Sequence, residues 1–317
     1  MEKNDEIVLD DQKVNNMVKK AKRKTLIKQV LISIIVTLIL VPVILIGILQ
    51  LTYRGADNMS RDIGMVDQIT RPNYKLLGDV TRRNLFGGEV EYDAYKIIEG
   101  TPILWGKEVY EYSFRNSFSR IDDRNPFEFG EEDASTRHFY HGDTLQREMQ
   151  FYHPKGKYTG YLNDVSLLEG HPDKVAEMAI SFNKSYTVQD IKKMLPDQIT
   201  PVWYWVDTNE NLKNLEDMPE VAHYVYGFDA EPGYIEYGDG TEKDFILAVE
   251  SGMKMKGKYK NEYKRIYDFL RKEKKEPSPD DVKVIGVVVT GTTENLKNLS
   301  DQPYAKAIVL GAVVDRK

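Results

Sequence analysis

Cysteine is absent from this chain of 317 residues. Its absence excludes disulfides, a lipoprotein anchor, zinc sites ligated by cysteine and catalysis by a thiolate. Any large folded region outside a membrane must therefore be stable through its core alone. Charge is also absent from residues 29–53, although 30% of the whole chain is charged. One uncharged block in an otherwise polar chain excludes both a wholly cytosolic globular enzyme and a multi-pass transporter.

The uncharged block has the length and composition of a membrane span. From position 30 to 48 it is almost unbroken Leu, Ile and Val, and about 20–25 such residues cross ~30 Å of hydrocarbon as a helix. We therefore predict a transmembrane helix at residues 29–53, with Tyr53 as an interfacial anchor. A cleaved signal peptide is the alternative, but its apolar region is usually shorter, and ILQLTYRGA is a poor cleavage context.

The charges on the two sides of this segment predict its orientation. Residues 1–28 hold eight Lys and Arg against five Asp and Glu, a net +3, whereas residues 54–317 hold 36 against 45, a net −9. The positive-inside rule places the amino terminus in the cytoplasm and the carboxyl terminus outside the cell membrane. The acidic exterior opposes general adhesion to nucleic acid or anionic lipid.

The predicted cytoplasmic tail, residues 1–28, contains an amphipathic helical pattern. Apolar side chains recur at i, i+3, i+4 and i+7, at Val14, Met17, Val18 and Ala21. The remaining surface is basic, with Lys19, Lys20, Lys22, Arg23, Lys24 and Lys28. Such a helix can lie on anionic headgroups, which attract each basic residue by about 1 kcal/mol, or it can dock on a cytosolic partner. Spacing alone favours the first interpretation and leaves the second open.

The predicted exterior divides into two regions. In residues 54–170, Tyr and Phe alternate with charges at 89–98 and 107–114, which predicts strands of an antiparallel sheet in a β-rich, membrane-proximal part. Residues 171–317 combine apolar β-rich runs with helical patterns at 187–195, 241–249 and 259–270. We expect an α/β domain here, with a mixed sheet flanked by helices.

This carboxyl-terminal region also repeats a motif. The hexapeptide ENLKNL occurs at 210–215 and again at 294–299, and each copy lies between two apolar β-rich runs. The pattern predicts an internal duplication of a strand-ENLKNL-strand unit. Its two leucines are best explained as core anchors and its asparagines as turn formers.

The sequence offers little for catalysis. There is no GxSxG elbow, no Walker loop and no GxGxxG after a strand. His138 and His141 lie near Asp143, but a catalytic zinc site needs three protein ligands, so hydrogen-bonded surface histidines are the default. Trp203 and Trp205 share one strand face, where core packing is favoured over a carbohydrate platform. We expect no catalytic, cofactor or metal site.

Several stretches resemble a known family. The run KKAKRKTLIKQVLISIIVTLILVPVIL, followed by RPNYKLLGDV and LFGGEVEYDAYKIIEGTPILWGKEVYEYS, is similar to the amino-terminal part of a Gram-positive sigma factor regulator family, membrane-bound anti-sigma factors of bacilli. The portion from about Ala176 onward, with ENLKNL and the closing AIVLGAVVD, resembles the carboxyl-terminal domain of that family. Together these stretches cover most of the chain.

The resemblance implies a single-pass regulator. Its cytoplasmic part would hold an extracytoplasmic-function (ECF) sigma factor away from core RNA polymerase, and its outer part would sense the cell envelope. This tail is too short for the folded inhibitory domain that anti-sigma factors commonly carry, so binding would be direct through one helix or would need a second membrane protein. Two alternatives remain: an envelope binding or assembly module without a sigma partner, and an extracytoplasmic hydrolase.

Overall fold

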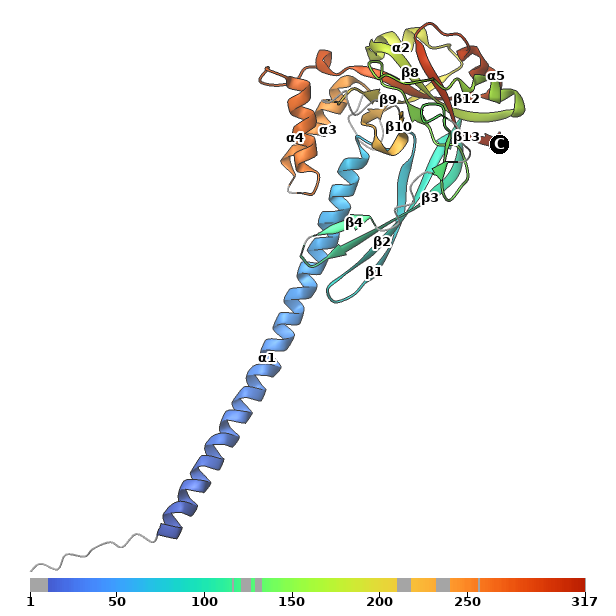
Figure 1. Cartoon of the computed structure of the whole chain (residues 1–317). Coiled ribbons are helices and arrows are strands. Elements are labelled where there is room, and N and C mark those ends of the chain that lie inside the picture. The colour runs from blue at the N-terminus through green and yellow to red at the C-terminus, as the bar shows by residue number, and fades with distance from the viewer. Residues whose placement is uncertain are drawn as a thin grey trace, which may run out of the picture.

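A computed structural model describes most of the chain. The described residues are 11–115, 117–120, 127–128, 133–209, 218–231, 240–255 and 257–316. Within them, one long apolar helix at the amino-terminal end precedes a β-rich region with several sheets (Figure 1).

The long helix is α1 (Asp11–Asp67), a single element of 57 residues. It continues through Pro42, which removes one backbone donor but is tolerated in long apolar helices. By length and composition, α1 is the one helix among the described residues that could cross a membrane, and none of its most apolar window is buried. The segment predicted to span the membrane, residues 29–53, lies inside it.

The structure corrects one boundary, because the helix does not end at Tyr53. Residues 54–67 extend it by about 21 Å at 1.5 Å per residue. Ala56, Met59 and Ile63 form an apolar stripe at helical spacing, and all three are buried against a sheet. The region predicted to be β-rich therefore begins with about four further turns of the same helix, stabilised by packing on the sheet.

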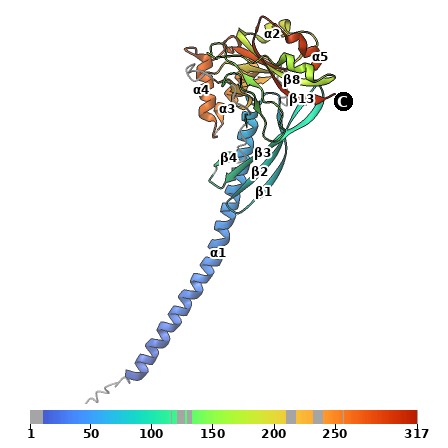
Figure 2. The same ribbon diagram turned by 45° about the vertical axis from the view of Figure 1, so that its right-hand side comes forward.

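The first sheet lies beside this part of α1 (Figures 1 and 2). Its strands, in spatial order, are β1 (Lys75–Arg83), β2 (Gly87–Ile98), β3 (Thr101–Ser113) and β4 (Phe118–Arg120), all antiparallel. The two strands predicted from alternation are thus confirmed. They are joined by Glu99 and Gly100, both with positive φ, which suits the twist of a tight hairpin.

The second sheet has five strands in the order β11-β9-β12-β8-β13. Their bounds are β8 (Lys174–Tyr186), β9 (Thr200–Val206), β11 (Gly227–Asp229), β12 (Val284–Thr292) and β13 (Ala305–Asp315). Each pair of neighbouring strands is antiparallel, so the expectation of a mixed sheet was wrong. The reason is topological: β12 lies between β8 and β9 and runs against both of them.

Short elements complete the fold. Two small sheets pair β5 (Phe127–Glu128) with β6 (Phe139–Tyr140) and β7 (Gln150–Phe151) with β10 (Glu220–Val221). The shorter helices are α2 (Val188–Met194), α3 (Glu242–Lys254), α4 (Lys260–Arg271) and α5 (Thr293–Leu296). The short 3-10 helices are η1 (Asp164–Gly170), η3 (Ala222–Tyr224), η4 (Pro279–Asp281) and η5 (Lys297–Leu299).

Local signals account for the helix starts. Thr187 and Asp190 form a capping box before α2, and Thr241 and Asp244 form another before α3. Each box satisfies backbone N–H groups that a helix end leaves without partners. The three helices predicted in this region are confirmed.

The second copy of ENLKNL forms α5 and η5, between β12 and β13. Leu296 and Leu299 are fully buried in the main core, as the interpretation of the motif as a core anchor predicts. The first copy, at 210–215, lies outside the described residues. The strands around the two copies are arranged differently, since β9 pairs with β11 whereas β8 separates β12 from β13. The duplication therefore stays a prediction.

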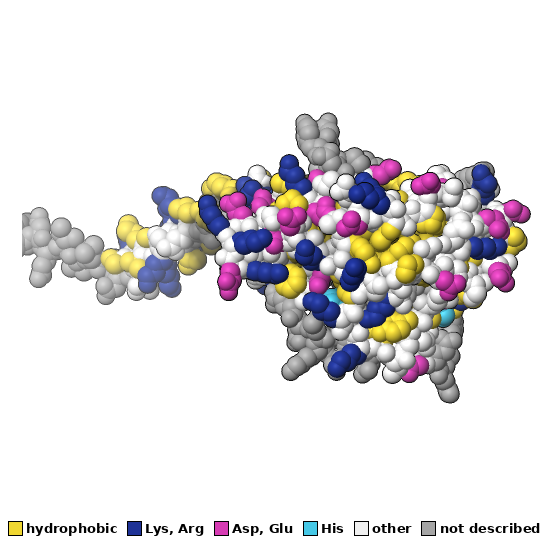
Figure 3. All heavy atoms as spheres, turned by 90° about the horizontal axis from the view of Figure 1, so that it is seen from above, with side chains coloured by type: hydrophobic (Ala, Val, Ile, Leu, Met, Phe, Trp, Pro, Cys, Tyr) yellow, Lys and Arg dark blue, Asp and Glu magenta, His cyan; other side chains and the backbone are white. Residues whose placement is uncertain are grey.

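The face of the molecule opposite the amino-terminal half of α1 carries charges of both signs. Figure 3 shows Lys and Arg interspersed with Asp and Glu over its described part. Such mixed charge does not favour a polyanion such as nucleic acid, which needs a basic patch.

The buried leucines of the second ENLKNL copy give a stability prediction. In Leu296→Ala, a side chain with no exposed surface is removed from the core, and we expect the free energy of unfolding to fall by about 2–5 kcal/mol. Leu247→Ala is the matched control, because Leu247 is 47% exposed and its loss should change stability by less than about 1 kcal/mol. Urea unfolding of the full chain in detergent, followed by tryptophan fluorescence, measures both. Equal effects would contradict the packing described here.

Candidate functional site at the end of the long helix

The carboxyl-terminal end of α1 is tied to two segments of the region that follows it. The backbone N–H of Gly227, at the start of β11, donates to the carbonyl oxygen of Ile69 at 2.9 Å. The backbone N–H of Lys258, just before α4, donates to Oδ2 of Asp62 on α1 at 3.1 Å. The end of the helix is therefore held between the first sheet, the second sheet and α4, and it cannot move without disturbing them.

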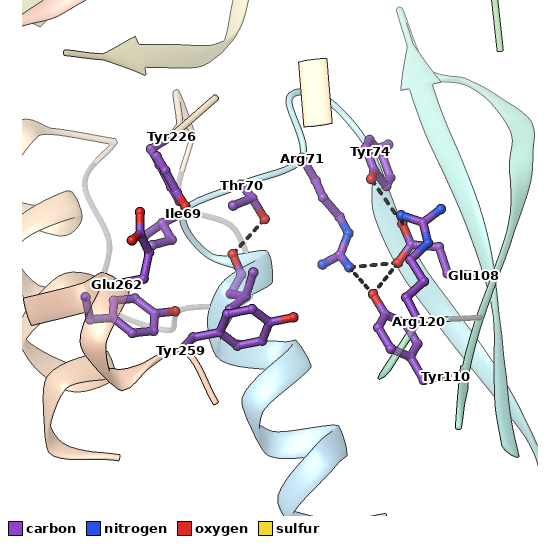
Figure 4. Close-up of a pocket in the computed structure, with 12 residues that line it drawn as sticks. Ile69, Thr70, Arg71, Tyr74, Glu108, Tyr110, Arg120, Tyr226, Tyr259 and Glu262 are labelled. Atoms are coloured by element: carbon purple, nitrogen blue, oxygen red, sulfur yellow. Dashed lines mark hydrogen bonds and ion pairs between the residues drawn. The ribbon is translucent and has the colours of Figure 1, made fainter. Parts of the chain in front are cut away.

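A pocket of about 230 Å³ opens at this junction (Figure 4). Its walls come from the end of α1, from β3 and β4, from α4 and from the residue before β11. The lining is aromatic, with Tyr74, Tyr110, Tyr226, Tyr259 and Tyr263, and it is also charged, with Arg71, Glu108, Arg120 and Glu262. Concave sites that combine ring faces with a few placed polar groups are typical of small-molecule binding.

Arg71 and Glu108, which line the pocket, form an ion pair with each other. Nη2 of Arg71 lies 2.8 Å from Oε2 of Glu108, and the two side chains are 7% and 4% exposed. Glu108 also accepts hydrogen bonds from the hydroxyls of Tyr110 at 2.6 Å and Tyr74 at 3.1 Å. Burial alone would raise the pKa of Glu108, but the positive charges of Arg71 and Arg120 lower it to about 2. The carboxylate stays ionised at physiological pH.

The turn that follows α1 is strained in a way that serves this pair. Arg71 and Asn73 both have positive φ, at 62° and 55°, in a region that side chains other than glycine rarely adopt. Nη1 of Arg71 is also 2.5 Å from Oδ1 of Asp67, one helical turn earlier. The ion pairs to Glu108 and Asp67 hold the arginine in a backbone conformation that would otherwise be unfavourable.

A second buried ion pair joins the two sheets. Nζ of Lys96 on β2 lies 2.5 Å from Oε1 of Glu177 on β8, and both side chains are essentially inaccessible. The same ammonium lies 3.6 Å from the ring centroid of Trp105. Glu177 also accepts hydrogen bonds from the side-chain amide of Asn73 at 2.7 Å and from the backbone N–H of Ala312 at 3.2 Å. Donors from three segments therefore meet at one carboxylate.

Glu148 adds a further carboxyl group beside this pair. Its burial, with the nearby charge of Glu177, raises its pKa to about 7, although Lys96 opposes the shift. One buried ammonium thus faces two carboxyl groups, which cannot both be ionised cheaply. The cluster therefore changes its charge near neutral pH, at the contact between the sheets.

The side chains predicted to bind a partner lie at the opposite end of α1. Val14, Met17 and Val18 are 38%, 71% and 44% exposed, and Ala21 is exposed on the same face. The predicted membrane-surface residues are all exposed as well: Lys19, Lys20, Lys22, Arg23, Lys24 and Lys28. Their binding roles stay predictions.

The histidines considered for a metal site have separate partners. Nε2 of His138 lies 3.0 Å from Oδ1 of Asp164, whereas the ring of His141 lies against Trp105, with centroids 4.7 Å apart. Nδ1 of His141 accepts a hydrogen bond from the backbone N–H of Asp143. Within the part of the chain that the structure describes, no group of three or more His, Cys, Asp or Glu could hold a metal ion.

The paired tryptophans belong to the core. Trp203 and Trp205 are 0% and 1% exposed and pack on Phe151, so core packing is confirmed over a carbohydrate platform. His153 is fully buried, with Nε2 3.2 Å from Oδ1 of Asp207.

Sequence reasoning missed the buried charges, although one signal was present. Along β2, Val90, Ala94 and Ile98 define the buried face with a period of two, and Lys96 falls on that face. Ile97 falls on the other face and is 52% exposed, whereas Lys96 is 1% exposed. The position of Lys96 on the strand therefore decides its burial, although its side chain is charged. A lysine on an otherwise apolar strand face indicates that a buried partner of opposite charge lies nearby.

The position of Glu148 gives a pH-dependent prediction. Its folded-state pKa of about 7 lies above its ordinary value of 4.5, so the stability that this group contributes at low pH is lost as pH rises through about 7. We expect Glu148→Gln to remove this loss, and thus to gain up to about 3 kcal/mol relative to the native chain between pH 4 and pH 8. Urea unfolding across this range measures the difference. The exposed control Glu169→Gln should differ by less than about 0.5 kcal/mol throughout. A difference for Glu148→Gln that is independent of pH would contradict the assignment.

Comparison with known proteins gives two matches on this chain. Residues 15–103 match the model described as sigma factor regulator N-terminal, and residues 168–312 match sigma factor regulator C-terminal. No curated protein and no solved structure matches. The two matched regions are the ones that the Lys96–Glu177 ion pair joins. The chain belongs to the sigma factor regulator family.

Proposed function

We propose that this regulator acts across a membrane. Residues 29–53 of α1 span the bilayer, residues 1–28 lie in the cytoplasm, and the remainder lies outside. The tail restrains an ECF sigma factor, directly or through a second membrane protein, and the outer region senses the state of the envelope. Family membership supports the anti-sigma-like role, and the net charges of +3 and −9 on the two sides of the span support the orientation.

The observation that carries the proposal is the continuity of α1. One unbroken helix extends from the exposed apolar stripe around Met17 to the pocket around Arg71. Because a continuous helix transmits a rotation or a shift along its axis, repacking at one end moves the other. No separate linker has to carry the signal.

The pocket suits the sensing step. Its walls belong to several segments, so an occupant that contacts Tyr259, just before α4, and Arg120 on β4 changes the packing between elements that also hold α1. Figure 4 shows both side chains among those that line the pocket. If α1 and the two sheets can pack in two arrangements, an occupant that binds one arrangement more tightly shifts the population toward it.

The exposed stripe near the start of α1 supports a small output surface. An apolar stripe such as Val14, Met17, Val18 and Ala21 can occupy a groove on a partner. A single helix binds weakly by itself, which makes a second membrane protein a reasonable part of the complex. The alternative is an extracytoplasmic binding or assembly module of the envelope with no sigma partner.

The orientation can be tested with single cysteines, since the chain has none of its own. In intact cells, a membrane-impermeant maleimide should label Lys275→Cys, in the loop after α4, and should not label Gln12→Cys in the tail. Permeabilised cells are the control, in which both positions should react. Labelling of Gln12→Cys in intact cells would contradict the proposed orientation or the proposed membrane span itself.

The tail partner can be tested by photo-crosslinking in cells. A photoreactive amino acid at Met17, which is 71% exposed, should capture a sigma factor or a membrane protein that itself binds one. Asn16 is the matched control, because the neighbouring position on a helix points away from the stripe. We expect the crosslinking yield at Met17 to be at least about tenfold higher than at Asn16. A tenfold ratio corresponds to a difference of about 1.4 kcal/mol in binding free energy.

The same cells distinguish the alternative. If replacement of residues 1–18 by an unrelated polar sequence leaves sigma-dependent transcription unchanged, and Met17 captures no transcription partner, the envelope module is the correct function. Altered transcription together with capture at Met17 supports the regulator.

A further inference from the structure

We propose that the turn end of the first sheet docks on the surface of an anionic lipid bilayer. This end, called here the sheet tip, consists of the β1–β2 turn at residues 83–87 and the adjacent described residues of the β3–β4 turn, 113–115 and 117. The two turns are joined, because the backbone N–H of Phe114 donates to the carbonyl oxygen of Phe86 at 2.8 Å. The inference rests on the proposed function, in that α1 must cross the same bilayer.

The sheet tip is held at the depth where the uncharged run of α1 ends. The hydroxyl of Thr52 donates to the carbonyl oxygen of Leu85 at 3.0 Å. At Gly55, a Cβ atom would lie 2.5 Å from the carbonyl oxygen of Ser113, so the backbones of α1 and β3 touch there. In Figure 1 the β1–β2 turn points back along α1 toward its amino-terminal half. If residues 29–53 span the bilayer, the tip lies at its surface.

The side chains of the tip suit the headgroup region. Phe86 is 55% exposed, and its ring lies 5.9 Å from that of Phe114. The guanidinium of Arg83 lies 5.1 Å from the ring centroid of Tyr53, and that of Arg115 lies 5.5 Å from the ring of Phe114. Exposed aromatic rings with adjacent cations are typical of surfaces that enter the boundary between headgroups and acyl chains.

The local charge departs from that of the exterior as a whole. Within the described residues, no ion pair involves Arg83 or Arg115, while Nη2 of Arg82, one position earlier on β1, lies 3.3 Å from Oε2 of Glu91. The exterior has a net charge of −9 and is repelled by anionic lipid in general. A tip with two such arginines would therefore select the one orientation in which this end faces the membrane.

Docking at the tip would fix the position of the first sheet relative to the membrane. With the sheet tip on the bilayer and the far end of the sheet packed on β8 and β13 through Lys96–Glu177, a shift of α1 relative to the sheet becomes a shift relative to the membrane. A lipid surface is the occupant we propose. A second copy of the chain at the tip is the other outcome that the test can detect.

The test uses the full-length chain reconstituted in vesicles of phosphatidylcholine and phosphatidylglycerol. A single cysteine at Ser117, an exposed residue of the tip, carries a fluorophore, and a lipid with a nitroxide near the top of its acyl chain is the quencher. Lys275→Cys, whose native side chain is 94% exposed, is the label outside the tip. Leu38→Cys, in the middle of the proposed span, is tested with a nitroxide in the middle of the acyl chain.

We expect the label at Ser117 to be quenched and the label at Lys275 not to be quenched. Phe86→Asp should abolish the quenching at Ser117, because it places an anion where the ring meets anionic lipid. Val80→Asp is the matched control. Val80 is also 55% exposed on the same hairpin. However, the part of β2 that pairs with it lies beside Ser60 of α1, and Ser60 is about 12 Å from Thr52 along the helix, so Val80 lies well away from the sheet tip. The control should leave the quenching intact.

The arginines are tested as a pair. Arg83→Gln with Arg115→Gln should weaken the docked state by about fivefold for each cation removed, whereas lysine at both positions should restore it. Rescue by lysine separates charge from any structural role of the guanidinium groups. Quenching that is equally strong in vesicles of phosphatidylcholine alone would overturn the requirement for anionic lipid.

The outcomes separate this inference from the proposed function. If Leu38 is quenched and Ser117 is not, the span stands and the docking of the tip is wrong. If Ser117 is shielded from aqueous iodide but not quenched by the lipid, a second copy of the chain covers the tip, and the inference is again wrong. If Leu38 is not quenched by any lipid, α1 does not span the bilayer, and the proposed function fails with the inference.

Discussion

The rest of the structure depends on one constraint, the continuity of α1 from Asp11 to Asp67. A helix that ended at Tyr53 would leave the β-rich region on a flexible tether. Because Ala56, Met59 and Ile63 continue the helix onto the first sheet, the candidate span and the β-rich region share one rigid element. The pocket, the exposed stripe around Met17 and the sheet tip all take their positions from this helix.

The junction is held by buried charge as well as by apolar packing. A buried ion pair adds little net stability, because desolvation opposes the attraction, but the loss of one partner is expensive. Arg71–Glu108 and Lys96–Glu177 therefore act chiefly as constraints, since few arrangements of α1 and the two sheets satisfy all their donors and acceptors. A junction with few permitted arrangements is suited to switching between them, because its elements do not deform continuously.

Sensing and output occupy opposite ends of the same helix in the function we propose. The tyrosine-lined pocket and the carboxyl of Glu148 lie where elements meet, so a ligand or a proton there acts on packing that also holds α1. The tail needs only a small exposed stripe, because the helix delivers the change to it.

Local patterns in the sequence determined the elements. The uncharged run specified a long apolar helix, alternation specified β2 and β3, and the capping residues Thr187 and Thr241 placed the starts of α2 and α3. The buried leucines of ENLKNL and the core tryptophans also followed from composition, because burial of apolar surface needs no particular partner. The family resemblance rested on stretches that are themselves local.

Only the tertiary structure decided which elements meet. Arg71 and Glu108 are 37 residues apart and Lys96 and Glu177 are 81 apart, so no periodicity relates them. The antiparallel order of the second sheet and the length of α1 beyond Tyr53 likewise depend on contacts between distant segments. The physical reason is that periodicity records which face of an element is buried, whereas the partner of that face is chosen by packing and charge across the whole fold.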